Sequence, residues 1–284
     1  MFRLRNSTTD YQLKPLSEAF LFELRVYNKR YILGGAVMIS QLETTRSFSS
    51  HAKQRANSSL TTIIILGIFA GLYSAMGCFA AQLAETMTDN HVIGSFIFPT
   101  SSILTTCCGG TLFTGNLLLT IGFFKHKITI KELFRYLSIA YLTNFFGSLI
   151  FVFIISLCSF KGVIIDFIIK VGNTKTSYTF VEALSRAILC GVLVNLGAWL
   201  SYAGESLVEK ICGVFFPTML FYLCGFEHCI TNMYFIPLAM VYSKQITITM
   251  FLGNLIPVTL GNIIGGAFII ASGYCYSFLR DIRD

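Results

Sequence analysis

His228 stands out among the polar residues because it lies inside a long apolar stretch of the chain. The three other histidines, His51, His91 and His126, belong to polar segments. An imidazole can donate or accept a hydrogen bond and can take up a proton near neutral pH. Because its neighbour Glu227 is also ionisable, and such groups are costly in apolar surroundings, we expect a lined cavity here. A histidine that only packs and is satisfied by hydrogen bonds is the alternative.

Two further charged residues stand near the start of the apolar run 178–202. Lys175 precedes it, and a cation at the mouth of a pore would raise the local concentration of anions. A solvated loop lysine is an equally good interpretation of Lys175. Glu182 lies one turn into the run. Backbone amides at a helix end can hold such a carboxylate, so we expect Glu182 to be structural.

The remaining reactive residues do not form a pattern of catalysis or metal binding. The chain has nine cysteines, most of them inside apolar runs, with no CxxC pair and no His/Cys cluster. This argues against a zinc site and a disulfide framework. Cys229 follows His228 directly, but no nucleophile, base and orienting group can be read together. The sequence therefore predicts a protein that is not an enzyme and needs no metal or cofactor.

The composition predicts an all-α integral membrane protein. Mean hydropathy is +0.69 and only 12% of the 284 residues are charged, whereas soluble domains carry about 25%. The net charge of +7 does not indicate nucleic acid, because the basic residues lie mainly at the ends of apolar runs, where they set orientation in a membrane.

Six apolar runs are long enough to cross a bilayer. They cover residues 60–83, 92–124, 133–160, 178–202, 211–242 and 247–278. We expect residues 161–175 to form a connecting loop. Basic residues gather before the first run, between the second and third, and after the last. The positive-inside rule then predicts a multi-pass protein of the plasma (inner) membrane with both termini cytoplasmic.

The first 55 residues carry scattered basic residues and no spanning run. We expect residues 1–55 to form a cytoplasmic extension, in part an amphipathic surface helix. Residues 56–284 form the predicted six-helix transmembrane channel domain, which has the lipid bilayer as its surroundings.

The second and fifth runs contain segments that are poor continuous helix. The second holds Pro-Thr-Ser-Ser and Thr-Thr-Cys-Cys-Gly-Gly-Thr, and the fifth holds Gly-Phe-Glu-His. Irregular backbone at membrane depth survives only beside protein or a water-filled cavity. Residues 143–151 of the third run also resemble residues 261–269 of the sixth. Three spans per repeat require inverted halves, and paired broken helices then indicate a transport path near the midplane.

Several side chains beside the two breaks are candidates for the pore. Apolar rings and leucine can form constrictions that exclude hydrated ions, although each residue taken alone is better explained by ordinary packing. The candidates for a constriction are Phe98, Leu112, Phe113, Phe221 and Val194. The candidates for a central polar patch are His228, Thr114 and Asn232, and Asn116 and Asn262 are expected to be structural polar residues.

Four motifs together resemble the formate–nitrite transporter family. They are Leu-Phe-Thr-Gly-Asn at 112–116, Gly-Phe-Glu-His at 225–228, Asn-Leu-Ile-Pro-Val-Thr-Leu-Gly-Asn-Ile-Ile-Gly-Gly at 254–266 and Trp-Leu-Ser-Tyr-Ala-Gly at 199–204. The last resembles the formate-channel branch. The resemblance covers about residues 56–280. It implies six helices in an aquaporin-like inverted 3+3 repeat with helices two and five broken, and a homopentamer with one pore per protomer.

The same resemblance implies roles for individual residues. The loop of residues 105–114 would gate the pore. Phe98, Phe113 and Phe221 would form an outer constriction and Leu112 an inner one. The central polar patch would contain Thr114 and His228, and Lys175 would attract anions.

An anion must lose its water to pass an apolar constriction, and neutralising it removes most of that cost. We therefore expect a channel or transporter for small monovalent weak-acid anions that is coupled to protons. Formate is the first candidate, with nitrite or hydrosulfide as alternatives. A different class, an aquaporin-like channel for neutral solutes, would not need Lys175 and would show no proton coupling.

Overall fold

The computed structural model describes residues 30–33 and 36–280. Residues 1–29 of the predicted N-terminal extension therefore lie outside the described residues. The expectation of a helical fold is confirmed, with one small addition: strands β1 (Arg30–Leu33) and β2 (Ala36–Ile39) form an antiparallel pair. The helix α2 (Gln41–Ala56) follows.

Four helical segments are long and apolar enough to cross a membrane. They are α3 (Leu60–Thr88), α7 (Ile130–Leu157), α9 (Phe180–Ala203) and the continuous stretch of α12 (Ile248–Ile263), the π-helical η2 (Ile264–Ala271) and α13 (Ser272–Leu279). These segments correspond to the first, third, fourth and sixth predicted runs.

The second and fifth predicted runs are interrupted helices. The second comprises α4 (His91–Ile97), α5 (Thr100–Cys107), the 3-10 helix η1 (Gly115–Leu119) and α6 (Thr120–Phe124). The fifth comprises α10 (Leu207–Leu223) and α11 (Cys229–Tyr242). Between these pieces the chain leaves helical geometry where the sequence is rich in glycine and small polar residues, and Gly109 and Gly225 have positive φ angles of 86° and 63°. Glycine adopts that backbone region at little cost.

The predicted loop of residues 161–175 is wrong, because this segment forms the helix α8 (Val163–Ser177). Its buried residues Ile164, Ile168 and Gly172 recur every fourth position and so lie on one face. Charged residues lie between them, and the mixed composition concealed an amphipathic helix.

Close helix crossings at glycine position the long helices. A Cβ on Gly71 of α3 would lie 2.0 Å from the backbone oxygen of Asn144 in α7, and one on Gly147 would lie 2.0 Å from that of Ile68. Between α9 and the last helical stretch, a Cβ on Gly191 or Gly265 would come within 2.5 Å or 2.2 Å of a backbone oxygen. Larger residues at these crossings would push the helices apart.

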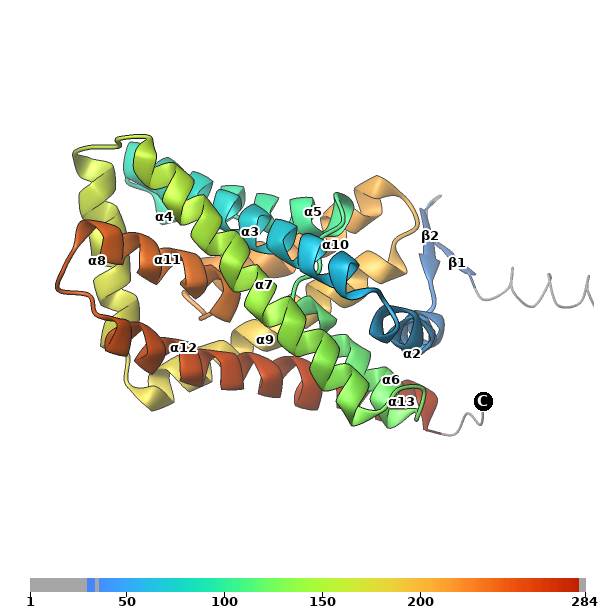
Figure 1. Cartoon of the computed structure of the whole chain (residues 1–284). Coiled ribbons are helices and arrows are strands. Elements are labelled where there is room, and N and C mark those ends of the chain that lie inside the picture. The colour runs from blue at the N-terminus through green and yellow to red at the C-terminus, as the bar shows by residue number, and fades with distance from the viewer. Residues whose placement is uncertain (1–29, 34–35, 281–284) are drawn as a thin grey trace, which may run out of the picture.

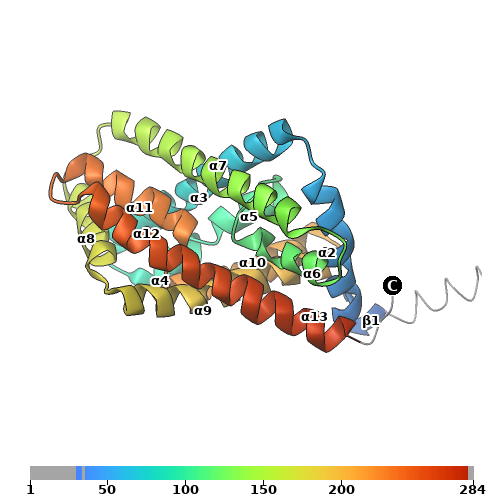
Figure 2. The same ribbon diagram turned by 60° about the horizontal axis from the view of Figure 1, so that its bottom comes forward.

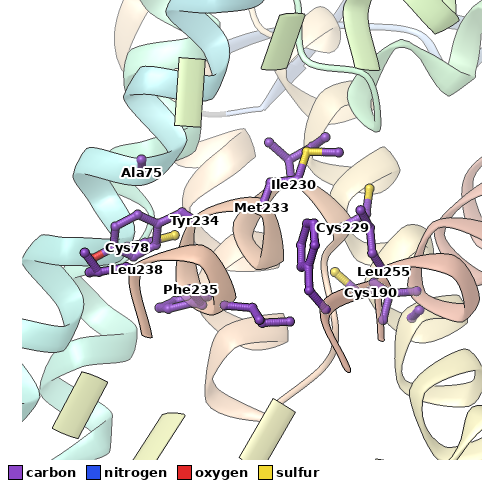
Figure 3. Close-up of a cluster of buried hydrophobic side chains, with 14 of the residues drawn as sticks. Ala75, Cys78, Cys190, Cys229, Ile230, Met233, Tyr234, Phe235, Leu238 and Leu255 are labelled. Carbon is purple, nitrogen blue, oxygen red and sulfur yellow. The ribbon is translucent and has the colours of Figure 1, made fainter. Parts of the chain in front are cut away.

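The short helix α11 lies at the centre of the molecule. All residues from 229 to 236 are buried, as expected of a helix surrounded on every side. Figure 3 shows Tyr234 of α11 reaching towards Cys78 and Ala75 of α3. The Tyr234 hydroxyl donates to Gln82 Oε1 at 2.8 Å.

Different helices lie at the two ends of the molecule. In Figures 1 and 2, α8 lies at one end of the molecule, and α2 and α13 lie at the other. The breaks of the two interrupted helices lie between these ends.

Candidate functional site: a pore centre between two pockets

His228 is the residue that immediately precedes α11, and it meets the other interrupted helix. Its Nε2 lies 2.8 Å from Oγ1 of Thr114, and both side chains are buried. The Nδ1 atom has no hydrogen-bond partner among the residues that the structure describes. The two breaks are therefore joined by a polar contact that leaves one imidazole nitrogen available.

The amide of Asn262 fixes the backbone on both sides of His228. Its Oδ1 accepts from the backbone N–H of Cys229 at 2.9 Å, and its Nδ2 donates to the carbonyl of Glu227 at 2.9 Å. Nδ2 also donates to the carbonyl of Ala187 at 2.8 Å. Asn262 thus supplies partners for backbone groups that the broken helix leaves without intrahelical ones.

Asn144 makes the matching contacts at the other break. Its Oδ1 accepts from the N–H of Phe113 at 2.9 Å, and its Nδ2 donates to the carbonyls of Thr111 and Gly67, both at 2.9 Å. Leu112 is therefore held in the same way as His228. The two interrupted helices share one local frame, with leucine at the central position of one and histidine at that of the other.

Aromatic rings cover His228 on the side of α8. Phe98 and Phe221 meet edge to face with centroids 5.2 Å apart, and Phe221 lies 5.6 Å from the His228 ring. Phe98 also stacks on Tyr222 at 4.3 Å. The ring of Phe113 packs edge-on against Tyr141 at 4.9 Å. The structure thus brings two of the three predicted outer aromatic residues together and places the third against α7.

A cavity of about 220 Å³, the α8-side pocket, opens beyond these rings. Its lining includes Lys175, Glu227, Phe221, Glu85 and His91. Lys175 Nζ lies 2.8 Å from Glu227 Oε1, and Glu227 is only 2% exposed. Lys175 therefore lines this pocket, and its charge is compensated by a carboxylate.

A network of amides holds this ion pair. Asn232 Nδ2 donates to Glu227 Oε2 at 2.6 Å and lies 2.7 Å from Oδ1 of Asn254. Asn254 Nδ2 donates to the backbone carbonyl of Lys175 at 2.7 Å. The Asn232 side chain thus binds Glu227 and Asn254, and its backbone N–H donates to the carbonyl of His228 at 3.0 Å.

A second cavity of about 160 Å³, the α2-side pocket, lies on the other side of the centre. Leu112, Val194, Asn116 and Arg55 contribute to its lining. Two of the predicted constriction residues, Leu112 and Val194, therefore line the same cavity. Asn116 donates to the carbonyl of Leu112 at 2.6 Å and accepts from Arg55 Nη1 at 2.6 Å.

Glu182 lies apart from both pockets. Its carboxylate accepts from the N–H and the hydroxyl of Thr179 at 2.9 and 2.8 Å, and the Thr179 hydroxyl accepts from the N–H of Glu182. This reciprocal arrangement closes the first turn of α9.

Sequence reasoning did not single out Arg55 and Tyr222, which line the two pockets, or Asn254, which binds the backbone of Lys175. Arg55 was one of many basic residues in a polar segment, and nothing nearby distinguished it. Asn254 had a signal, because a buried amide in an apolar run needs partners. Among residues 39–280, no group of three or more His, Cys, Asp or Glu side chains could hold a metal ion.

Comparisons with known proteins agree on one family. The family model described as Formate/nitrite transporter matches residues 42–276. A "Probable formate transporter" of Methanothermobacter thermautotrophicus is 29% identical over 87% of this chain and 100% of its own. "Formate channel FocA" of Escherichia coli strain K12 is 30% identical over 76% of this chain and 86% of its own.

Solved structures show the same fold. A chain described as "FNT family ion channel" superposes with a TM-score of 0.78 at 24% identity, over 83% of this chain and 98% of the other. A "Pentameric formate channel with formate bound" gives 0.69 at 28% identity, over 78% and 98%. With its interrupted helices, this chain belongs to the formate/nitrite transporter family.

Proposed function

We propose that this protein is a transmembrane channel for small monovalent weak-acid anions, with formate as the principal substrate and proton uptake coupled to passage. The observation that carries the proposal is the His228–Thr114 contact between the two pockets, with Phe98 and Phe221 on one side and Leu112 on the other. A route built in this way offers polar groups at its centre and apolar barriers at either side.

The apolar barriers decide the mechanism. Leaving water costs an ion several kcal/mol or more, and a neutral acid pays far less. In our proposal an anion enters a pocket, takes a proton from water or with the help of His228, and crosses as the neutral acid. One imidazole nitrogen of His228 contacts Thr114, and the other, Nδ1, has no hydrogen-bond partner among the described residues.

Formate ranks first because the relatives named above include formate channels, and one of them is a channel with formate bound. Nitrite and hydrosulfide are the rival anions. The chain is proposed to have no catalytic activity, since its family is one of transporters.

The architecture extends this proposal. We count six membrane crossings by adding the two interrupted helices to the four long ones, and we assign the halves to an inverted 3+3 repeat. The matching contacts of Asn144 and Asn262 support that repeat. Exposed phenylalanines such as Phe146, Phe153 and Phe216 give the helices apolar outer faces. These faces suit contact with lipid and with the neighbouring protomers of a homopentamer, and one solved relative is described as pentameric.

The proposed placement is the plasma (inner) membrane with both termini cytoplasmic, which sets the α2 end inside. Residues 1–55 form the extension and residues 56–284 the channel domain.

A flux experiment tests the function. The protein is reconstituted in liposomes, and uptake of formate, nitrite, hydrosulfide, lactate and glycerol is measured at about pH 6 and about pH 8, on either side of the ordinary imidazole pKa. We expect saturable formate uptake that is faster at the lower pH. Glycerol uptake without anion uptake would instead establish a neutral-solute channel and refute the proposal.

Two matched variants test the role of His228. His228→Asn keeps a hydrogen-bonding group near Thr114 but cannot titrate, and we expect it to lower formate uptake by at least about tenfold. His126→Asn, at an exposed position with positive φ where asparagine is tolerated, is the control and should match the parent protein. Unchanged pH-dependent uptake in His228→Asn would show that the imidazole takes no part.

A further inference from the structure

His91, the first residue of α4, lines the α8-side pocket and lies between two other helices. Its Nδ1 lies 3.0 Å from Oε1 of Glu85 in α3, and its Nε2 lies 3.3 Å from the backbone carbonyl oxygen of Leu223, the last residue of α10. The side chain of His91 is 51% exposed, whereas that of Glu85 is only 9% exposed. One accessible imidazole therefore forms a bridge between α3 and α10, the His91 bridge.

Both ring nitrogens of His91 face hydrogen-bond acceptors. The carboxylate of Glu85 and the carbonyl of Leu223 accept hydrogen bonds and donate none. A neutral imidazole has one N–H group, and only the imidazolium has two. The His91 bridge is therefore complete when the imidazole is protonated, and loss of the proton leaves one of its two contacts without a donor.

The His91 bridge is attached to the aromatic rings at the centre of the molecule. The His91 ring stacks on Tyr222 with centroids 5.5 Å apart, and the Tyr222 hydroxyl interacts with the carboxylate of Glu85. Tyr222 stacks in turn on Phe98 at 4.3 Å, and Phe98 meets Phe221 edge to face at 5.2 Å. Because Phe221 and Tyr222 belong to the last turn of α10, a contact that holds the end of this helix also holds both rings.

The other charged groups around the pocket do not replace the His91 bridge. The titratable residues of α8 that line the pocket are Lys170, Lys175 and Tyr178. Lys175 is paired with Glu227 at 2.8 Å. Asp89, at the C-terminal end of α3, lies outside ion-pair distance of His91. Within the described part of the chain, His91 is the one cationic partner of the Glu85 carboxylate.

We propose that His91 is a positioning residue that sets the size selectivity of the channel. As the imidazolium it ties the end of α10 to α3 and keeps the aromatic rings closely packed, and on losing its proton it releases that end. The channel then discriminates most strongly against larger anions when the solution on the α8 side is acidic. The inference rests on the proposed channel function and adds a control of selectivity that is separate from proton coupling at His228.

The ratio of lactate to formate exchange measures size selectivity without measuring proton coupling. Both anions are carboxylates of acids of similar strength, so a change of pH alters their neutral fractions alike. Tracer exchange of each is measured in liposomes with the same pH on both sides, at about pH 5.5 and about pH 8, which lie on either side of the ordinary imidazole pKa.

Three variants of the full chain separate the possible roles of the side chain. His91→Phe keeps a ring beside Tyr222 but has no donor, and His91→Lys keeps a charged donor at both pH values. His126→Asn is the matched control, because it removes another histidine from an exposed position.

We expect the ratio of lactate to formate exchange in the parent protein to be about threefold higher at the higher pH, a size in keeping with a half-exposed ion pair. His91→Phe should give the higher ratio at both pH values, and His91→Lys should give the lower ratio at both. His126→Asn should follow the parent protein.

The imidazole itself supplies a readout that does not require transport. Protein labelled with nitrogen-15 at histidine is studied in liposomes by solid-state NMR at the lower pH, and the His91 signals are identified by their absence in His91→Phe. Both ring nitrogens should be protonated. Glu85→Gln should move the Nδ1 signal, because the acceptor changes from a carboxylate to an amide.

Two outcomes would overturn the assignment. One is a ratio of lactate to formate exchange that is the same at both pH values in the parent protein, or that changes with pH equally in His91→Phe. The other is a Nδ1 signal of His91 that does not respond to Glu85→Gln. If the parent protein exchanges neither anion, the proposed function fails, whereas a Nδ1 signal that depends on Glu85 would still support the His91 bridge.

Discussion

Replacing Asn262 by leucine tests whether the pore centre depends on a single buried amide. The side chain is fully buried and binds the residues before and after His228. Leucine has a similar size and cannot donate or accept a hydrogen bond. The substitution therefore removes the contacts without opening a large cavity.

The magnitude follows from the groups left without partners. The Cys229 N–H and the Glu227 carbonyl lose the only hydrogen bonds that the structure gives them. The Ala187 carbonyl also loses its bond to Asn262, but it lies inside α9, where the helix itself supplies a partner. A buried backbone group without a partner costs about 1–3 kcal/mol. Two such groups predict a loss of about 2–6 kcal/mol in the free energy of unfolding.

The assay is unfolding in mixed micelles with increasing sodium dodecyl sulfate, followed by the fluorescence of the single tryptophan, Trp199. Asn173→Leu is the control, because Asn173 is exposed. We expect Asn262→Leu to unfold at clearly lower detergent fractions and to lose formate uptake under conditions where it is still folded. An Asn262→Leu protein that matches Asn173→Leu in both measurements would refute the reasoning.

Three further predictions concern a helix crossing, an ion pair and the aromatic layer. Gly71→Ala should lower the unfolding midpoint in the same assay, because its Cβ would lie 2.0 Å from a backbone oxygen, whereas Gly253→Ala, with open space around it, should be neutral or stabilising by up to about 1 kcal/mol. Lys175→Met should destabilise by about 3–5 kcal/mol by leaving the buried Glu227 unpaired, and adding Glu227→Gln should restore most of the loss; equal stability of the single and double variants would contradict this. Phe221→Ala should raise the ratio of lactate to formate uptake in liposomes, and an unchanged ratio would show that the Phe221 ring does not limit substrate size.

Much of the fold was accessible from the sequence because a bilayer imposes strong constraints. The length of the apolar runs predicted the long helices, and glycine with small polar residues marked both breaks. The similar segments 143–151 and 261–269 contain Asn144 and Asn262, and these two residues hold the two breaks with matching hydrogen bonds. These signals lie in short stretches of the chain, so one sequence is enough to detect them.

The sequence failed where position depends on tertiary contacts. The helix α8 has a mixed composition, and only its burial pattern against the core shows one apolar face. Arg55 is separated from its partners Asn116 and Tyr202 by long stretches of chain, and no spacing in the sequence joins them. Lys175 was named as a candidate from the sequence, but its ion pair with Glu227 could not be inferred from residue types alone.

The two matched frames explain how one backbone arrangement can serve different chemistry on its two sides. Asn144 and Asn262 hold equivalent segments, yet the central residue is Leu112 in one and His228 in the other. Since the amides bind backbone atoms only, the side chain between them can change without altering the frame. An apolar side chain and a titratable one then fill the same structural position, and in our proposal selectivity therefore depends on a few side chains rather than on the course of the helices.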